Sequence, residues 1–238
     1  MNVQLRTMVT VAAIAAVTSL SPAAAQDLRM SGSWVLSAPV QGSLKTAAGT
    51  DAPYTAAARA VLAERMAAGI SGDPVDSACL PPGIPRLMTT QPPFSVLITP
   101  VKVTMLHEFQ HTIRHIHLNE DMPAEEDIDP FFGGTSVGRW DGNTLVVTTG
   151  RFNDQIWLDQ AGSPQSENAV ITERFTVSED GGKLVNQITI EDAANYTQPW
   201  TATLSYDRSD VVQLKEDVCA YKLLAPSLRA QIDSGRTQ

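Results

Sequence analysis

The stretch NAVITERFTVSEDGGKLVNQITIE, residues 168–191, contains two runs in which apolar and mostly polar side chains alternate, one before and one after Asp180-Gly181-Gly182. Alternation with a period of two is typical of a strand that buries one face, and a glycine-rich turn between two such runs predicts a hairpin. We therefore expect antiparallel strands at residues 168–177 and 184–191.

The same rhythm extends over most of the chain from residue 94 onward. It predicts further strands at 94–99, 101–108, 111–118, 135–140, 143–149, 199–206 and 210–218, and one around Trp34. Nine or ten short strands with hairpin-length gaps favour an antiparallel meander, and closure into a barrel removes its unpaired edges. The predicted fold is mainly β: a single antiparallel barrel.

Two segments outside the strands have their own signals. Residues 54–68 predict one N-terminal helix, with Thr55 as a candidate cap. Residues 73–86 hold four prolines and predict an irregular loop. A short helix and a frayed end are expected over 226–238.

The first 25 residues have the pattern of a secretory signal. Arg6 precedes an apolar run over residues 8–20, and small residues at 23–25 offer a cleavage site. The run is too short for a membrane span. We therefore expect a periplasmic or secreted protein whose residues 26–238 form a single domain.

Charge and cysteine content narrow the class of protein further. The formal net charge of −9 argues against nucleic acid or anionic lipid as a partner. Cys79 and Cys219 are the two cysteines. In an oxidising compartment such a pair predicts a disulfide, here between an early loop and the last predicted strand.

All four histidines lie in HEFQHTIRHIH, residues 107–117, which contains the zinc-protease string H-E-x-x-H. That site requires a helix, which places both histidines on one face. The local alternation instead predicts two strands that meet near residues 108–111. No histidine elsewhere could be a third ligand, which leaves a distant carboxylate for that role. His115 and His117 would share one strand face, pointing either into the barrel or to solvent.

Several stretches together resemble a widespread family of exported bacterial proteins, mostly without an assigned function. The resemblance rests mainly on CLPPGIPRLM at 79–88, HTIR at 111–114, SVGRWDGNTLVV at 136–147 and YTQPW at 196–200. It implies a lipocalin-like, calycin-type barrel, and Gly32-x-Trp34 is similar to the first-strand signature of lipocalins. It also makes His111 and Arg114 candidates for a site common to the family. His115 and His117 depart from the family's pattern, so any role they have is expected in this chain and not in its relatives.

The candidate catalytic residues carry groups that can transfer or stabilise a proton. Asp159 lies two residues after Trp157, so on a strand the two would share a face. An inward Glu173 would need Arg114 or a histidine as partner, and a purely structural ion pair is the alternative. The full set is Glu108, His111, Arg114, Asp159 and Glu173.

Five large aromatic residues could line a ligand site, although each is equally suited to an ordinary core: Trp140, Phe152, Trp157, Tyr196 and Trp200. No G-x-S-x-G motif surrounds Ser166 and no glycine-rich phosphate loop occurs. We expect neither a cofactor nor a catalytic metal.

The leading hypothesis is an exported barrel that binds a small apolar or aromatic molecule. Whether it also performs cofactor-free acid–base chemistry, of the isomerase, cyclase, lyase or hydratase type, the sequence leaves open. The main alternative is a non-catalytic periplasmic protein that holds a divalent metal through the histidine cluster. A structural or assembly factor, with an exposed apolar patch and no internal pocket, is a third possibility.

Overall fold

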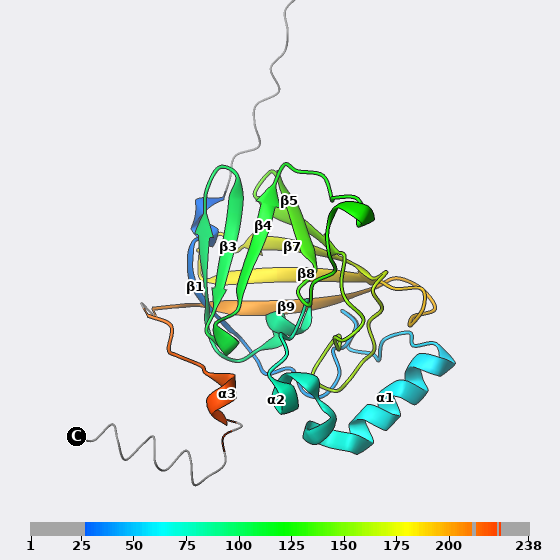
Figure 1. Ribbon diagram of the computed structural model, residues 1–238. Coiled ribbons are helices and arrows are strands. Elements are labelled where there is room, and N and C mark those ends of the chain that lie inside the picture. Colours follow the sequence, from blue (N-terminus) through cyan, green and yellow to red (C-terminus); the bar gives the residue numbers. More distant parts are fainter. Residues whose placement is uncertain (1–26, 211–212, 223, 225–238) are drawn as a thin grey trace, which may run out of the picture.

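The computed structural model (Figure 1) describes residues 27–210, 213–222 and 224. The expected secretory signal at 1–25 and the expected helix at 226–238 lie outside these residues. In the described part of the chain, no helix combines the length and the apolar character needed to cross a membrane.

Within the described residues, nine strands form one closed barrel in which each strand pairs with its neighbour in sequence and the last pairs with the first. The mainly β fold and the closure are thus confirmed. The strands are β1 Gly32–Leu36, β2 Phe94–Ile98, β3 Lys102–His107, β4 Ile113–Leu118, β5 Thr135–Asp141, β6 Thr144–Gly150, β7 Val170–Val177, β8 Lys183–Glu191 and β9 Trp200–Ser209.

One strand pair is parallel, so the expected all-antiparallel meander is wrong at this point. β4 and β5 pair in parallel from Ile116↔Ser136 to Leu118↔Gly138, whereas β9 closes on β1 in antiparallel fashion. Strand directions cannot alternate all the way around a closed ring of nine strands, so one neighbouring pair must be parallel. A parallel pair requires a long crossover connection. Residues 119–134 are that connection.

The strand expected at 210–218 is also not formed: residues 213–218 contain no strand. Both edges of β9 are already occupied, by β8 and by β1, so the barrel has no free edge for a further strand. The chain leaves the barrel instead and reaches a short helix, α3 (Cys219–Lys222).

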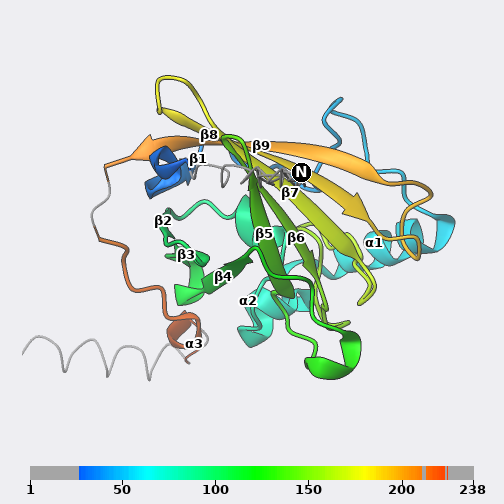
Figure 2. The ribbon, with the colours of Figure 1, turned by 90° about the horizontal axis from the view of Figure 1, so that it is seen from above.

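The N-terminal helix is confirmed as α1 (Ala56–Ala68), and the Thr55 side chain caps it by accepting a hydrogen bond from Ala58 N at 3.2 Å. The expected irregular loop at 73–86 contains a further short helix, α2 (Pro74–Ala78). Proline is compatible with this helix because it stands in the first turn, where its missing N–H would have no partner. In Figure 1 both α1 and α3 lie below the strands, α3 to the left and α1 to the right, and Figure 2 also shows them well apart.

Cys79 follows α2 and forms the predicted disulfide with Cys219, the first residue of α3, with the two Cα atoms 5.7 Å apart. The described end of the chain is thereby attached to the segment before β2. Neither cysteine belongs to a strand, so the disulfide joins two segments that flank the barrel and does not link two of its strands.

Alternating side chains fill the barrel. In Figure 1, β3, β4 and β5 cross in front of β7, β8 and β9 at a steep angle, as in orthogonally packed sheets. Inward residues of both layers form one hydrophobic core, which includes Trp34, Met105, Ile116, Phe175 and Ile188. The polar side chains that enter this core are therefore exceptions that call for a partner or a role.

Candidate functional site

The H-E-x-x-H segment is not an α-helix, and the two strands do meet where they were expected to. β3 ends at His107, a 3-10 turn covers Phe109–His111, and β4 begins at Ile113. Gln110 and His111 both have left-handed backbone conformations, with φ of 49° and 50°. The segment therefore reverses direction within a few residues, which an α-helix cannot do.

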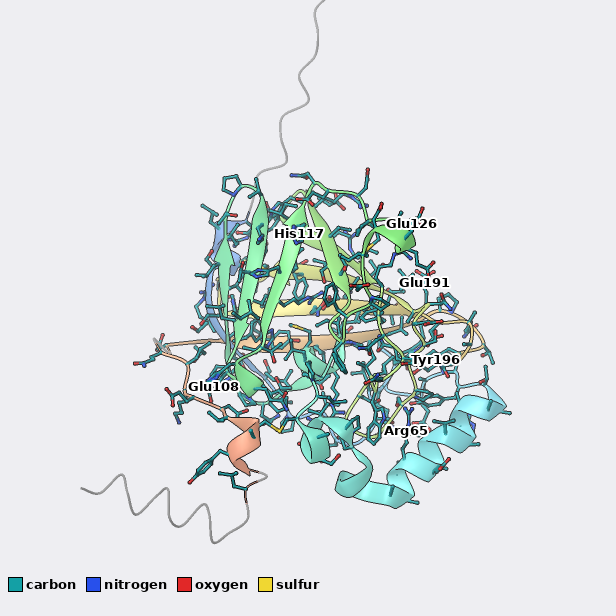
Figure 3. The ribbon with its side chains drawn as sticks, in the orientation of Figure 1. Arg65, Glu108, His117, Glu126, Glu191 and Tyr196 are labelled. Atoms are coloured by element: carbon teal, nitrogen blue, oxygen red, sulfur yellow. A yellow bond between two sulfur atoms is a disulfide. The ribbon has the colours of Figure 1, made fainter. Side chains whose placement is uncertain are left out.

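The reversal separates the four histidines. His107 points into the barrel and is 2% exposed, whereas His115 and His117 lie on the outer side of β4. Figure 3 shows His117 and Glu108 toward opposite ends of the barrel. Among the described residues, no group of three or more His, Cys, Asp or Glu side chains is placed to hold a metal. The histidine cluster required by the metal-binding alternative is thus not assembled.

Glu108 and His111 hold the C-terminal segment rather than an interior site. Lys215 N donates to Glu108 Oε2 and Asp217 N donates to His111 Nε2, both at 2.9 Å. His111 is exposed, whereas Arg114 is buried on β4. The structure therefore does not bring His111 and Arg114 together as a pair.

Arg114 and Glu173 do come together inside the barrel, where Arg114 Nη2 donates to Glu173 Oε2 in an ion pair. The Arg114 and Glu173 side chains are 5% and 0% exposed. Asn186 Nδ2 donates to the other carboxylate oxygen at 2.9 Å. Arg114 also donates from Nη2 to Thr149 Oγ1 at 3.0 Å and from Nε to Ser136 Oγ at 3.3 Å. We call these five residues the Arg114 network.

His107 lies in the same interior, although it was not among the candidate catalytic residues. Its ring stacks on Phe94 at 5.0 Å, and neither ring nitrogen has a hydrogen-bond partner among the described residues. Burial, and to a smaller degree the positive charge of Arg114, lowers the pKa of His107 to about 3, so the ring is uncharged at neutral pH. The alternation along β3 could have predicted this inward position, because His107 follows Val103 and Met105 at every second residue.

A cleft of about 520 Å³ opens where β4 and β5 separate. Their pairing begins only at Ile116↔Ser136, so the first part of β4 has no β5 partner. Two members of the Arg114 network, Arg114 and Ser136, contribute to the cleft lining, as do His115 and His117. Most of the rest is apolar and includes Ile84, Leu87, Ile113, Ile128, Phe131 and Phe132.

Asp159 is a fully buried carboxylate with a structural set of partners. It accepts hydrogen bonds from Leu44 N at 2.8 Å, from Ala161 N and Ser163 N at 3.0 Å, and from Ser163 Oγ at 2.6 Å. Residues 157–159 form no strand: Trp157 makes only an isolated bridge with Pro164, so the alternation of a strand does not place Trp157 and Asp159 on a common face. Asp159 therefore organises the surrounding loops.

The five aromatic candidates are buried, and none contributes to the lining of the cleft as described. Tyr196 packs against Tyr54 and Trp200, each with ring centroids 5.4 Å apart. Figure 3 shows Tyr196 on the same side of the molecule as Arg65 of α1, and the Arg65 guanidinium lies 5.1 Å from the Trp157 ring centroid. Trp140 and Phe152 are 8% and 1% exposed. Four of the five belong to the hydrophobic core, whereas Trp157 lines a separate cleft beside Arg65.

No protein-family model matches the chain. No curated protein sequence matches it significantly either. Among solved structures, the chain resembles a REP1-NXSQ fatty acid transporter with a TM-score of 0.35 and 13% identity, covering 76% of this chain and 97% of that one. A likeness at this level does not indicate which ligand, if any, this chain binds.

Proposed function

We propose that this protein binds a small, mainly apolar molecule in the cleft between β4 and β5, and that Arg114 orients it. The observation that carries this proposal is the state of Arg114 Nη1. It is buried and has no hydrogen-bond partner among the described residues, and Arg114 itself lines the cleft. An unpaired buried donor costs about 1–3 kcal/mol, which an acceptor atom on a ligand would recover.

The size and lining of the cleft suit such a ligand. Small-molecule sites span roughly 300–1,000 Å³ and combine an apolar lining with a few polar groups. Ile113 and Phe131 contribute to the cleft while remaining 58% and 51% exposed. Covering them with an apolar ligand would remove hydrophobic surface from water.

The structure offers less support for acid–base turnover. Both carboxylate oxygens of Glu173 are already bonded, and Asp159 accepts four hydrogen bonds. Glu108 and His111 hold the C-terminal segment. A general base needs a free acceptor within reach of its substrate, so binding is the function we propose.

We further propose that the barrel is lipocalin-like and that the protein is exported to the periplasm or secreted. The closed barrel and the Cys79–Cys219 disulfide support this view, together with the signal-like pattern of the first residues. Cell fractionation, with sequencing of the mature N-terminus, tests the second part.

The binding proposal is tested with N-phenyl-1-naphthylamine, an uncharged fluorescent apolar probe. Ile113→Glu would place a charge in the cleft, and we expect it to weaken probe binding by about tenfold or more. Leu97→Glu is the matched control, because Leu97 on β2 is 53% exposed and does not line the cleft. Equal binding by both variants, or none by the wild type, would overturn the proposal. Native mass spectrometry of the purified protein would identify a co-purified ligand.

A further inference from the structure

The Arg114 guanidinium has one nitrogen without a partner among the described residues, and its donors define the group that a ligand must present. Nε and Nη2 donate to Ser136, Thr149 and Glu173. Nη1 carries two N–H donors and has no acceptor within the described ranges. The ligand must therefore supply an acceptor, not a further donor.

The charge of the surroundings decides what kind of acceptor this is. The positive charge of Arg114 is already balanced by the buried carboxylate of Glu173. His107, the neighbouring titratable ring, adds no charge at neutral pH because its pKa lies at about 3. An anionic ligand would lose its hydration without meeting a net positive charge, and a buried charge without compensation is costly.

A hydroxyl is also less suitable than a carbonyl. It would bring a donor that needs its own acceptor, and the interior acceptors without a partner among the described residues, Asn186 Oδ1 and one ring nitrogen of His107, belong to residues that do not line the cleft. A carbonyl oxygen accepts from both N–H groups of Nη1 and introduces no donor.

We infer that the ligand is an apolar molecule with an uncharged carbonyl group (a ketone, ester or amide) whose oxygen accepts hydrogen bonds from Arg114 Nη1. This inference rests on the proposed function, because it names the chemical class that the same cleft takes. It differs from a general apolar site in requiring the carbonyl, and from an anion site in rejecting a carboxylate.

A matched set of naphthalenes tests the inference on the full-length protein. 2-Acetylnaphthalene, 2-naphthoate and 2-ethylnaphthalene share one skeleton and differ in presenting a ketone, a carboxylate and no oxygen. We expect the ketone to bind about tenfold tighter than the ethyl compound, the gain of one hydrogen bond to a charged donor, and tighter than the carboxylate. Dissociation constants from displacement of N-phenyl-1-naphthylamine would show the order.

Two variants move the preference in predicted directions. Glu173→Gln leaves the Arg114 charge unbalanced, so the preference should shift from the ketone toward 2-naphthoate. Arg114→Met/Glu173→Gln removes both charges, so the ketone should lose its advantage over the ethyl compound. The double variant keeps the test valid if the single variant does not fold. Arg174→Met is the control, because Arg174 pairs with the exposed Asp141 on the outer face of β7.

The two proposals fail in different ways. If 2-naphthoate binds as tightly as the ketone, or the ketone binds no better than 2-ethylnaphthalene, the carbonyl inference is wrong while the apolar cleft stands. If none of the three binds and N-phenyl-1-naphthylamine does not bind either, the proposed function fails and the carbonyl inference fails with it.

Discussion

Arg114 and Glu173 form a buried ion pair. If either residue is replaced by an uncharged one, the charge of the other stays buried in the apolar interior without a partner. Both side chains are at most 5% exposed. Removing one partner of a buried pair typically costs about 3–5 kcal/mol, because it leaves an uncompensated charge. We expect Arg114→Met to lower the free energy of unfolding by this amount, and Arg114→Met/Glu173→Gln to recover most of the loss. Urea denaturation of the wild type and the variants measures both.

The double variant is also the control for side-chain volume at position 114, since both proteins carry the same methionine. If the single and double variants were equally unstable, lost packing rather than unbalanced charge would be the cause. That result would remove the basis for treating the interior as electrically balanced.

His107 makes the stability of the barrel depend on pH. The folded protein binds a proton at His107 only below about pH 3, whereas the ordinary value for the unfolded chain is 6.5. Between these values the unfolded state holds more protons, so the free energy of unfolding falls as the pH falls, by at most about 1.4 kcal/mol per pH unit from this residue. His107→Phe should flatten this dependence between pH 6.5 and 3, measured by urea denaturation at a series of pH values.

His115→Asn is the comparison for that experiment, because His115 lies on the outer side of β4 and is exposed. Partial burial and the charges of Lys102 and His117 lower the pKa of His115 as well, so this variant should flatten the slope slightly, and much less than His107→Phe does. A His107→Phe protein with an unchanged slope would mean that carboxylates, and not His107, produce the acid sensitivity.

At the scale of elements, the crossover from β4 to β5 forms part of the cleft lining, which includes the adjacent glycines Gly133 and Gly134. Gly134 has φ of +65°, and a Cβ there would lie 2.6 Å from Phe152 Cε1 and 2.7 Å from Gly150 O. A Cβ at Gly133 would meet no described atom within 4 Å. Gly134→Ala should therefore lower the free energy of unfolding by about 1–3 kcal/mol or more. Gly133→Ala should change it by less than about 0.5 kcal/mol.

Both glycines line the cleft, so probe binding and thermal unfolding should be measured together on the two variants. Loss of stability only in Gly134→Ala would confirm that the crossover is closely packed on Phe152. Similar unfolding temperatures for both variants would show that the crossover can shift without strain.

Individual elements were predictable where a local pattern specifies them. The helix α1 follows from the composition and cap of residues 55–68, and eight of the nine expected strand ranges, together with the one around Trp34, correspond to strands. The ninth, at 210–218, was wrong because alternation alone does not show whether a barrel edge is free. The parallel pairing of β4 with β5 was missed for a related reason: strand direction depends on the closure of the whole ring.

For the whole molecule, the Cys79–Cys219 disulfide joins segments 140 residues apart in sequence. Closing a loop of this length stabilises a protein by at most about 4–5 kcal/mol, through the entropy of the unfolded chain. Cys79→Ser/Cys219→Ser should lose part of this stability and make residues 213–222 more susceptible to proteolysis. The barrel itself should keep its strands, because β1 and β9 close it without help from either cysteine.

Denaturation with and without a reducing agent, with limited proteolysis at neutral pH, checks this expectation. The double-serine variant should behave in both states as the reduced wild type does. A loss of β-sheet circular dichroism in the variant at low temperature would mean that the barrel depends on the disulfide.

Alternation of side chains, helix composition and an even pair of cysteines were sufficient, from the sequence alone, to predict a barrel, a helix and a disulfide, since each depends on a short pattern or a count. Only the tertiary structure decided that Arg114 meets Glu173, 59 residues away, while His111, three residues from Arg114, points elsewhere. It alone placed the cleft at the parallel pair of β4 and β5. The physical reason is that such contacts depend on strand register and on closure around the ring, which no local period encodes.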